Sequence, residues 1–493
     1  MPVATTTPNP ARAADRSAHQ LSETAIGRRI KSFFAQPRLV FNSLFLFVFS
    51  AAWIRELFYW FHTDAFGTSL NYWAYTDWLI DYSQGFIRRG LSGEIWRLVP
   101  AALSRLEVVT LFSWFLILAA AFGTVRLLAR SWKTIHPLTL FGLLFLPSLF
   151  FFYMHDHDTI ARKEILGYLT LLLHLLIIEK TFPLAGGFTP TEGNLRRYLL
   201  WLVPVTVILL PAIILVHEGN LLLFVPLHVM ITLTVLQMQP RRTFLRAALW
   251  IGLLYLPAAI AFGAVYLAGT PGYPTLLGLC NKWLAAGALQ DSSCVLPPNQ
   301  LSGSTLPGSF NPMGWSLAQA AYYTMEIISM HWATWLLILP VLGVCLWYLV
   351  RQALYSILRS RFPQSFSSRS AQRYSGLFFR KYFLIPLLFS LPVYFTAYDY
   401  GRWFTVTCIN FVMLAVSVNL PCWEFALRKK GAGEEESTVT DSHAHLDRRM
   451  VFYAVSILIC SLVVVLWLPH YCIFSCTILR SPLLFFSHTY IVH

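Results

Sequence analysis

The stretch ILLPAIILVHEGNLLLFVPL, residues 208–227, decides how this chain folds. Two apolar runs flank the short polar segment His217-Glu218-Gly219-Asn220, with almost no loop between them. A helix that crosses a bilayer needs about 20 mostly apolar residues, and both runs extend far enough along the chain to supply them. The stretch therefore predicts a tight helical hairpin that holds His217 and Glu218 at membrane depth.

The chain as a whole has the composition of a polytopic membrane protein. Of its 493 residues, 56% are hydrophobic and 12% are charged, and its mean hydropathy is +0.57. A soluble domain carries about 25% charged residues, so these values exclude an ordinary soluble globule and a disordered chain. The net charge of the chain is +14. In a membrane protein, an excess of basic residues usually lies in the cytoplasmic loops, so we expect no nucleic-acid partner.

Similar apolar stretches on both sides of the hairpin predict an all-α fold, a polytopic membrane helical bundle of about eleven transmembrane helices. The expected spans are 40–60, 107–125, 137–153, 165–179, 199–216, 221–237, 247–268, 327–350, 382–397, 404–421 and 451–469. Residues 1–38 are polar and lack the apolar core of a signal peptide. We expect them to form a disordered, basic cytoplasmic tail, followed by a single transmembrane domain over 39–493.

The distribution of charge predicts the orientation of the bundle. If the N-terminus is cytoplasmic, eleven spans make the C-terminus extracytoplasmic, and 27 of the 37 Lys and Arg residues then fall on the inner side. This agrees with the positive-inside rule, and the opposite orientation would violate it. The longest loops are then 61–106 and 269–326 on the outside, and 351–381 and 425–450 on the inside.

The first outer loop contains DWLIDYSQGFIRRGLSGE, which starts at Asp77 and ends at Glu94. Asp77 and Asp81 are four residues apart, so on a helix they would share one face. Arg88 and Arg89 lie on the side where basic residues are few, and an arginine pair suits a phosphate or a carboxylate, which it can bind bidentately. The alternative is a structural network in which the arginines pair with Asp81 and Glu94.

A second charged motif, HDHDTIARKE, covers residues 155–164. Its alternating His and Asp residues, which end at Asp158, can in principle bind a divalent ion. Alternation in a short turn also points neighbouring side chains apart, which favours a charged network with Arg162 and Lys163 facing an anion, or a solvated loop. We assign no metal ligands here, and a divalent cation stays open as a cofactor.

Two further polar motifs follow at predicted outer ends of spans. His217 and Glu218, in the hairpin, can position or relay a proton, or simply cap a helix and make one buried hydrogen bond. The motif YDYGRW contains Asp399 and Arg402, which either bind a substrate or pair with each other. His228, in the apolar run after the hairpin, is expected to be a lone core histidine with a satisfied hydrogen bond.

Cysteine positions and the inner loops add two expectations. Cys280 with Cys294, and Cys472 with Cys476, can form disulfides if their segments face an oxidising compartment. The predicted inner loops contain neither a P-loop nor a GxGxxG motif, so a nucleotide site on that side is unsupported. The charged motifs instead share the outer side, which predicts a polar pocket at the outer membrane surface.

This layout resembles the GT-C class of membrane glycosyltransferases, which are polytopic and carry an acidic residue in the first extracytoplasmic loop. The resemblance covers the topology and that one acidic position. It implies an enzyme of the extracytoplasmic face whose partners are membrane lipid and a sugar donor on a polyprenyl phosphate. Asp81 or Asp77 would deprotonate an acceptor hydroxyl, with Asp158, Glu218 and His217 as further candidates. The candidates for the carrier phosphate or substrate are Arg88, Arg89, Arg162, Lys163, Asp399 and Arg402.

Three other functions stay open at this point. A multi-pass transporter or lipid flippase would place charged residues in the middle of its spans. A polysaccharide polymerase or another envelope transferase would share an outer pocket lined with arginines. A non-enzymatic assembly subunit would tolerate alanine at Asp81 and Arg88. The short loops favour a bacterial inner membrane as the location.

Overall fold

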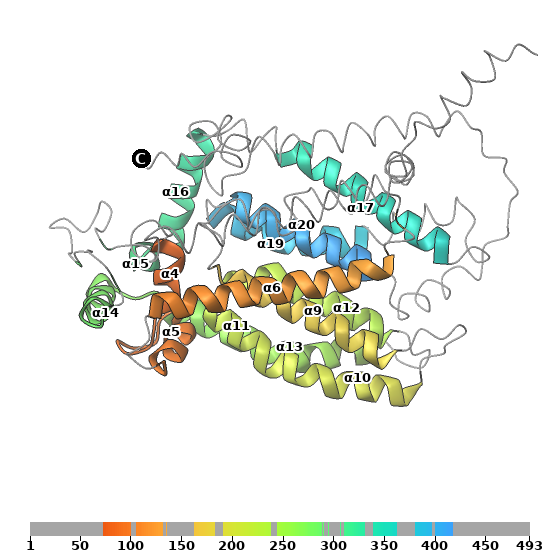
Figure 1. The fold of residues 1–493 in the computed structure, drawn as a ribbon, viewed down its shortest axis with the longest axis horizontal. Coiled ribbons are helices and arrows are strands. Elements are labelled where there is room, and N and C mark those ends of the chain that lie inside the picture. Colours follow the sequence, from red (N-terminus) through yellow and green to blue (C-terminus); the bar gives the residue numbers. More distant parts are fainter. Residues whose placement is uncertain are drawn as a thin grey trace, which may run out of the picture. The chain divides into compact units, whose positions relative to one another are not determined.

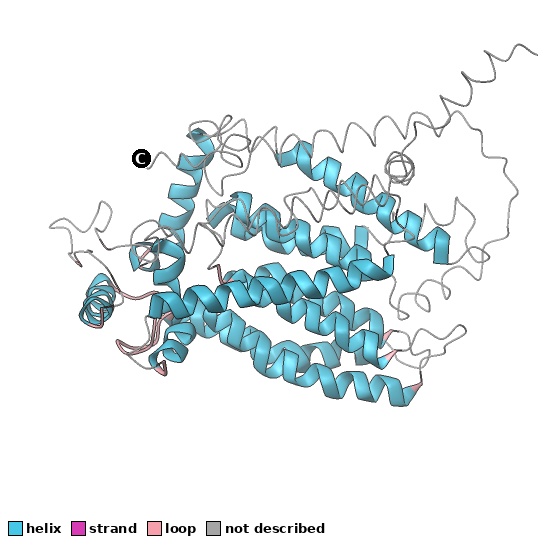
Figure 2. Ribbon diagram, in the orientation of Figure 1, coloured by secondary structure: helices cyan, strands magenta, loops and turns pink. Residues whose placement is uncertain are grey.

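The computed structural model describes residues 72–99, 105–131, 162–182, 191–237, 244–287, 310–330, 339–361, 380–396 and 400–417, with single residues 135, 289, 294 and 306. All of these belong to the unit formed by Glu56–His493. Their regular secondary structure is helical, and no strand occurs among them (Figure 2). The all-α fold class is therefore confirmed for the described part of the chain.

The helices follow one another along the chain as labelled in Figure 1. Their bounds are α4 Tyr72–Leu79, α5 Gly90–Arg97, α6 Arg105–Ser131, α9 Glu164–Thr181, α10 Glu192–Pro204, α11 Leu210–Val216, α12 Gly219–Leu236, α13 Phe244–Ala268, α14 Tyr273–Ala285, α15 Phe310–Met313, α16 Leu317–Met330, α17 Leu339–Arg361, α19 Ile385–Thr396 and α20 Tyr400–Ser417. Two π-helical turns, η3 Val205–Leu209 and η5 Arg380–Leu384, join α10 to α11 and lead into α19.

Three described helices are long and apolar enough to cross a membrane. They are the continuous helix Glu192–Val216, α12 and α13. Shorter apolar helices cover Leu111–Leu127, Tyr382–Thr396 and Val406–Ala415. Each of these six segments overlaps one of the spans expected from the sequence, because a long apolar run that must satisfy its own backbone hydrogen bonds in lipid can only be a helix.

The remaining expected spans have different outcomes. The span 165–179 lies within α9, an apolar helix that begins at Glu164. The span 327–350 meets two described helices, the end of α16 and the first half of α17. The spans 40–60, 137–153 and 451–469, the tail 1–38 and the inner loop 425–450 lie outside the described residues.

The hairpin at residues 208–227 forms as the sequence predicts. Helix α11 ends at Val216 and α12 begins at Gly219, so only His217 and Glu218 link the two helices. The side-chain amide of Asn220 donates to the carbonyl of Ile213 across the hairpin, with a distance of 3.0 Å. Helix α12 also packs against α9, α13 and α19.

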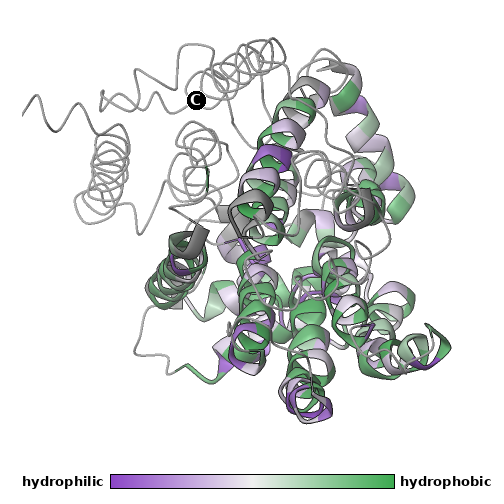
Figure 3. Ribbon diagram, turned by 90° about the vertical axis from the view of Figure 1, so that its right-hand side faces the viewer, coloured by the Kyte–Doolittle hydropathy of each residue, from purple (hydrophilic) through white to green (hydrophobic). Residues whose placement is uncertain are grey.

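Large apolar side chains are exposed along the described spans, as expected of surfaces that face lipid. Phe115 on α6, Trp201 on α10, Ile208 in η3 and Ile260 on α13 are each at least 60% exposed. Figure 3 shows hydrophobic residues along much of the described helical bundle. A soluble monomer seldom exposes so much contiguous apolar surface, which supports a membrane location for this bundle.

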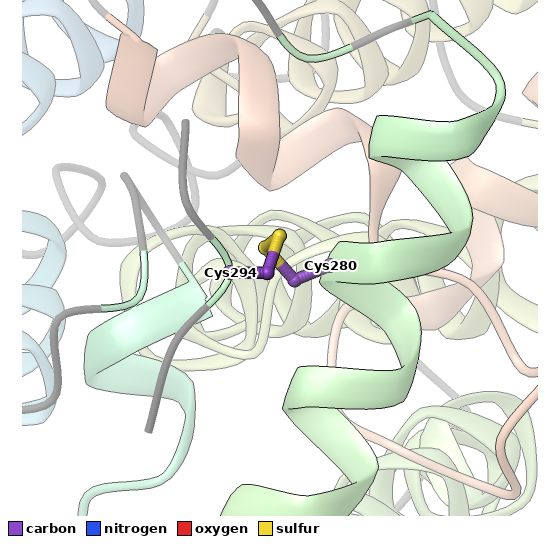
Figure 4. The surroundings of a disulfide bond; sticks show 2 residues. All are labelled: Cys280 and Cys294. Carbon is purple, nitrogen blue, oxygen red and sulfur yellow. A yellow bond between two sulfur atoms is a disulfide. The ribbon is translucent and has the colours of Figure 1, made fainter. Parts of the chain in front are cut away.

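A small core outside the main bundle ties the segment between α4 and α5 to the segment that follows α13. Buried residues of both segments form it, including Ile80, Ile87, Trp283 and Phe310. Cys280 of α14 is bonded to Cys294 inside this core (Figure 4). The pair Cys472 and Cys476 lies outside the described residues. The disulfide therefore anchors α14 beside the motif at residues 77–94.

His228 differs from the sequence prediction of a lone core histidine. Its Nδ1 lies 2.9 Å from Nδ1 of His174 on α9, and His174 Nε2 lies 2.6 Å from the hydroxyl of Tyr198. Thr232 continues this chain, because its hydroxyl lies 3.3 Å from that of Tyr198 and 2.8 Å from that of Tyr255. The predicted buried position and hydrogen bond of His228 are confirmed. Only its isolation was wrong, because the sequence of α12 cannot reveal which side chains on α9 and α10 face it.

Candidate functional site

A cluster of charged side chains lies where α4, α5, α9 and the α11–α12 link meet. We call it the charge cluster, and it consists of Asp77, Arg88, Arg89, Lys163, Glu164, His217 and Glu218. Three separate motifs of the sequence contribute to it, and the spans α11, α12 and α9 all end or begin at it. The backbone N–H of Arg88 also donates to the carbonyl of Gly269, just after α13, at 2.8 Å.

Asp77 is the inner centre of the charge cluster. Its Oδ1 accepts from Arg89 Nη1 at 3.1 Å, and its Oδ2 lies 3.2 Å from Lys163 Nζ. Lys163 also donates to the backbone carbonyl of Asp77 at 2.6 Å. The side chain of Lys163 is completely buried and that of Asp77 is 8% exposed. Both oxygens of this carboxylate are thus held by cations inside the protein.

Arg89 joins this inner centre to the more exposed Glu218. Its Nε and Nη2 bind the two oxygens of Glu218 at 2.9 and 2.8 Å, which is a bidentate fork. Arg89 has a φ of 65°, and it is the only residue other than glycine with a positive φ in the described part of the chain. A left-handed arginine is strained, and this strain persists because two carboxylates hold the guanidinium.

His217 contacts Glu164 of α9 and the backbone of Gly219. The N–H of Gly219 donates to His217 Nδ1 at 3.1 Å, so the ring proton of the neutral imidazole lies on Nε2. That Nε2 is 3.3 Å from Glu164 Oε1. Among the described residues, His217 and Glu218 form no hydrogen bond or ion pair with each other: His217 lies close to Glu164, and Glu218 binds Arg89.

Asp81 forms a second, separate ion pair. Helix α4 ends at Leu79, so Asp81 lies beyond it and does not share a helix face with Asp77. The expectation of a shared face was wrong, because the chain turns after α4 and its Gly85, with a φ of 107°, lies in that turn. Asp81 is fully buried, accepts from the N–H of Ser83 at 2.8 Å and pairs with Lys282 of α14.

Arg88 binds backbone rather than Asp81 or Glu94. Its Nη2 donates to the carbonyls of Pro312 and Met313 at 2.8 and 3.0 Å. Glu94 instead pairs with Arg97 on the same helix. The alternative network proposed from the sequence is therefore wrong in its partners, since Arg88 reaches a segment more than 200 residues away along the chain.

The electrostatics of the charge cluster follow from burial opposed by close charges. Burial alone would raise the pKa of Asp77, but Lys163 and Arg89 lower it well below its usual range. Burial would likewise raise the pKa of Glu218, and Arg89 lowers it strongly. Burial lowers the pKa of Lys163 to about 8, against the opposing effect of Asp77. Both carboxylates are thus ionised and poor bases at neutral pH.

The structure describes only some of the remaining site residues predicted from the sequence. Arg162 is partly buried next to Lys163. Asp158 and Asp399 lie outside the described residues, as does the side chain of Arg402, whose backbone belongs to α20. The ring of the neighbouring Trp403 lies 6.0 Å from the ring of His217, centroid to centroid. The motif at residues 398–403 therefore does reach the charge cluster, through its tryptophan.

Sequence reasoning missed Lys282 and the carbonyls that bind Arg88. A basic residue in a predicted outer loop is exceptional under the positive-inside rule, so the position of Lys282 in the loop 269–326 was a usable signal. Backbone carbonyls carry no such signal. Among the described residues, no group of three or more His, Cys, Asp or Glu side chains is placed to hold a metal ion.

Comparison of the chain with models of protein families, with curated proteins and with solved structures finds no match. The charge cluster and the Asp81–Lys282 pair are therefore the features of this protein from which a function can be inferred.

His217 predicts how stability depends on pH. Burial, followed by the nearby charge of Arg89, lowers its pKa from the ordinary 6.5 to about 4. The unfolded chain then binds more protons than the folded protein between these values. The free energy of unfolding should therefore fall as the pH drops from 7.5 to 5.5, by about 1 kcal/mol from this residue. Thermal unfolding in detergent at both pH values measures the loss.

The matched variant for this prediction is His217→Gln, whose amide oxygen can still accept from Gly219. We expect the variant to lose less stability than the wild type over the same pH interval. Asp77 and Glu218 do not contribute there, because their ordinary pKa values of 3.8 and 4.5 lie below it. Parallel losses in the two proteins would show that His217 does not titrate in this way.

Proposed function

We propose that this protein is an integral membrane glycosyltransferase that acts at the extracytoplasmic face on a sugar linked to a polyprenyl phosphate. Its role would be in the assembly of an envelope glycan or polysaccharide. The observation that carries the proposal is a buried carboxylate, Asp81, paired with the partly exposed Lys282. It belongs to the same loop as Arg88 and Arg89, which contact Gly269 after α13 and Glu218 after α11.

The disulfide supports the side of the membrane. Cys280, which precedes Lys282 by two residues in the sequence, is bonded to Cys294. Disulfides persist in oxidising compartments, so this end of the bundle is the extracytoplasmic one in our proposal. That orientation agrees with the distribution of Lys and Arg along the chain. The proposed topology has about eleven spans, a cytoplasmic N-terminus and an extracytoplasmic C-terminus, and the proposed location is a bacterial inner membrane.

Between the two candidate bases, the contacts favour Asp81 over Asp77. Both oxygens of Asp77 are bound by cations, one of which is the completely buried Lys163. Asp81 shares one oxygen with Lys282, whose side chain is 32% exposed and can leave when a substrate enters. Asp77, Lys163 and Glu164 then act as the framework that positions the site rather than as groups that react.

In the proposed reaction, Asp81 accepts the proton of an acceptor hydroxyl, and the oxygen attacks the anomeric carbon of the donor sugar. The bond between that carbon and the phosphate oxygen breaks, and the electron pair leaves with the polyprenyl phosphate. Lys282, Arg88 and Arg89 stabilise the charge that develops on the leaving phosphate. The products are the glycosylated acceptor and the lipid phosphate.

A direct assay tests the proposal. The full-length protein in nanodiscs is incubated with a panel of polyprenyl-phosphate hexoses and a membrane glycan extract, and the release of polyprenyl phosphate is measured. We expect release that depends on the protein and on one of the donors. If no donor is turned over while the protein is folded, the proposal is wrong.

A transporter is a second candidate, and one observation favours it. The buried chain from His228 through His174, Tyr198 and Thr232 to Tyr255 connects four helices inside the candidate spans. Polar chains of this kind occur in proton-coupled transport. Uptake of protons into proteoliposomes, abolished by His174→Phe, would favour transport over transfer of a sugar.

A further inference from the structure

We propose that Arg88 and Arg89 form a binding site for a phosphate group and that Glu218 occupies this site while no ligand is bound. The inference rests on the proposed function only in the choice of lipid probe, because the chemistry it invokes is that of any phosphate ester. Its central claim is that the Glu218 carboxylate competes with the ligand.

The contact between Arg89 and Glu218 has the geometry of anion recognition. Two parallel N–H groups of the guanidinium meet the two carboxylate oxygens at 2.9 and 2.8 Å. Arginine binds phosphate with this same planar fork. A carboxylate that already fills the fork is therefore a close mimic of the two phosphate oxygens that would replace it.

Arg88 also lies near the Glu218 carboxylate, but it makes no hydrogen bond to it. The carbonyls of Pro312 and Met313 fix one end of its guanidinium. Its Nη1 is 3.9 Å from Glu218 Oε1, too far for a hydrogen bond. Its Nε is buried and has no hydrogen-bond partner among the described residues. A phosphate has more oxygens than a carboxylate, so it can contact both arginines where Glu218 contacts only one closely.

Exposure shows that Glu218 can leave without disturbing the inner centre. The side chains of Arg88, Arg89 and Glu218 are 20–21% exposed. Asp77 is 8% exposed and Lys163 is completely buried, so Arg89 keeps its second carboxylate partner when Glu218 moves. Glu218 lies on the two-residue link between α11 and α12, where rotation of its side chain is sufficient to open the fork.

The experiment measures binding of two probes to the full-length protein in nanodiscs. One probe is soluble inorganic pyrophosphate, and the other is polyprenyl phosphate embedded in the nanodisc lipid. We expect Glu218→Gln to tighten binding by about 10-fold, because the neutral amide competes less well than the carboxylate for the guanidinium. Arg88→Gln should weaken binding by about 10-fold on the same grounds.

A matched control separates this effect from a general loss of negative charge. Glu94 also binds an arginine with both oxygens, at 2.9 and 2.8 Å, but its partner is the exposed Arg97. Glu94→Gln should leave the affinity for both probes unchanged. Thermal unfolding identifies variants that fail to fold, and Glu218→Asp, which keeps the charge on a shorter side chain, replaces Glu218→Gln if needed and should tighten binding to a smaller extent.

The sign of the change decides the outcome. Tighter binding of both probes supports a site for a free phosphate or a head group, and tighter binding of the lipid alone supports the lipid phosphate as the ligand. Unchanged or weaker binding in Glu218→Gln overturns the inference and makes Glu218 a structural partner of Arg89. If Glu218→Gln tightens binding but the wild type turns over no sugar donor, the proposed function fails and this inference stands.

Discussion

Replacing Lys163 with methionine is expected to lower the free energy of unfolding by about 3 kcal/mol. Lys163 is completely buried and binds both the carboxylate and the backbone carbonyl of Asp77. Removal of the ammonium leaves a buried carboxylate with Arg89 as its remaining close cation. Breaking a buried pair from one side is costly because the other charge stays desolvated. Chemical denaturation of the detergent-solubilised protein measures the loss.

Two comparisons make this prediction specific. Arg97→Met breaks the exposed pair with Glu94, whose side chains are 46% and 28% exposed, and should cost less than about 1 kcal/mol. The double variant Lys163→Met, Asp77→Asn removes the stranded charge and should be more stable than the sum of the single effects predicts. An additive double variant, or a Lys163→Met loss as small as that of Arg97→Met, would contradict the role of this pair.

Replacing Asp81 with asparagine should reduce kcat/KM for sugar transfer by about 100-fold to 10,000-fold. The amide has the size of the carboxylate, and its single oxygen can still accept from the N–H of Ser83, so the fold should persist. It cannot accept the proton of the hydroxyl at neutral pH, and the attacking oxygen loses its base. Initial rates of polyprenyl phosphate release, over a range of donor concentrations, measure the effect.

The control for this prediction lies in the same loop. Glu94 accepts from the N–H of Tyr82 at 2.8 Å, so Glu94→Gln removes a nearby carboxylate charge that is not assigned to the reaction. We expect its rate to stay within about threefold of the wild type. Lys282→Met should lower kcat more than it raises KM, because Lys282 stabilises the charge that develops on the leaving phosphate. Equal losses in Asp81→Asn and Glu94→Gln would remove Asp81 from its assigned role.

Much of the fold was predictable because it depends on short stretches of sequence. A run of apolar residues long enough to cross a bilayer has to be helical, whatever surrounds it. The two helices on either side of His217 and Glu218 follow from that rule alone. In the structure the first ends at Val216 and the second begins at Gly219. The end of α4 at Leu79 was not predictable in this way, because turn residues and packing decide it.

The sequence predicted several of the residues that form the charge cluster, but not which of them form ion pairs with one another. Charged residues near a bilayer are rare and costly, so the motifs with Asp77, Lys163 and Glu218 stood out, and the structure brings them together. Their partners did not follow. The sequence suggested pairs between neighbours, such as Arg89 with Glu94, whereas Arg89 binds Asp77 and Glu218, which lie 12 and 129 residues away along the chain.

Hydropathy and helical length are local properties, so the amino-acid sequence was sufficient to predict the apolar helices that the described part of the chain contains. The pairing of Asp77 with the buried Lys163 and with Arg89, and of Asp81 with the more exposed Lys282, required the three-dimensional structure. An ion pair needs two side chains within a few ångströms, and the packing of distant helices, not their spacing in the chain, sets that distance.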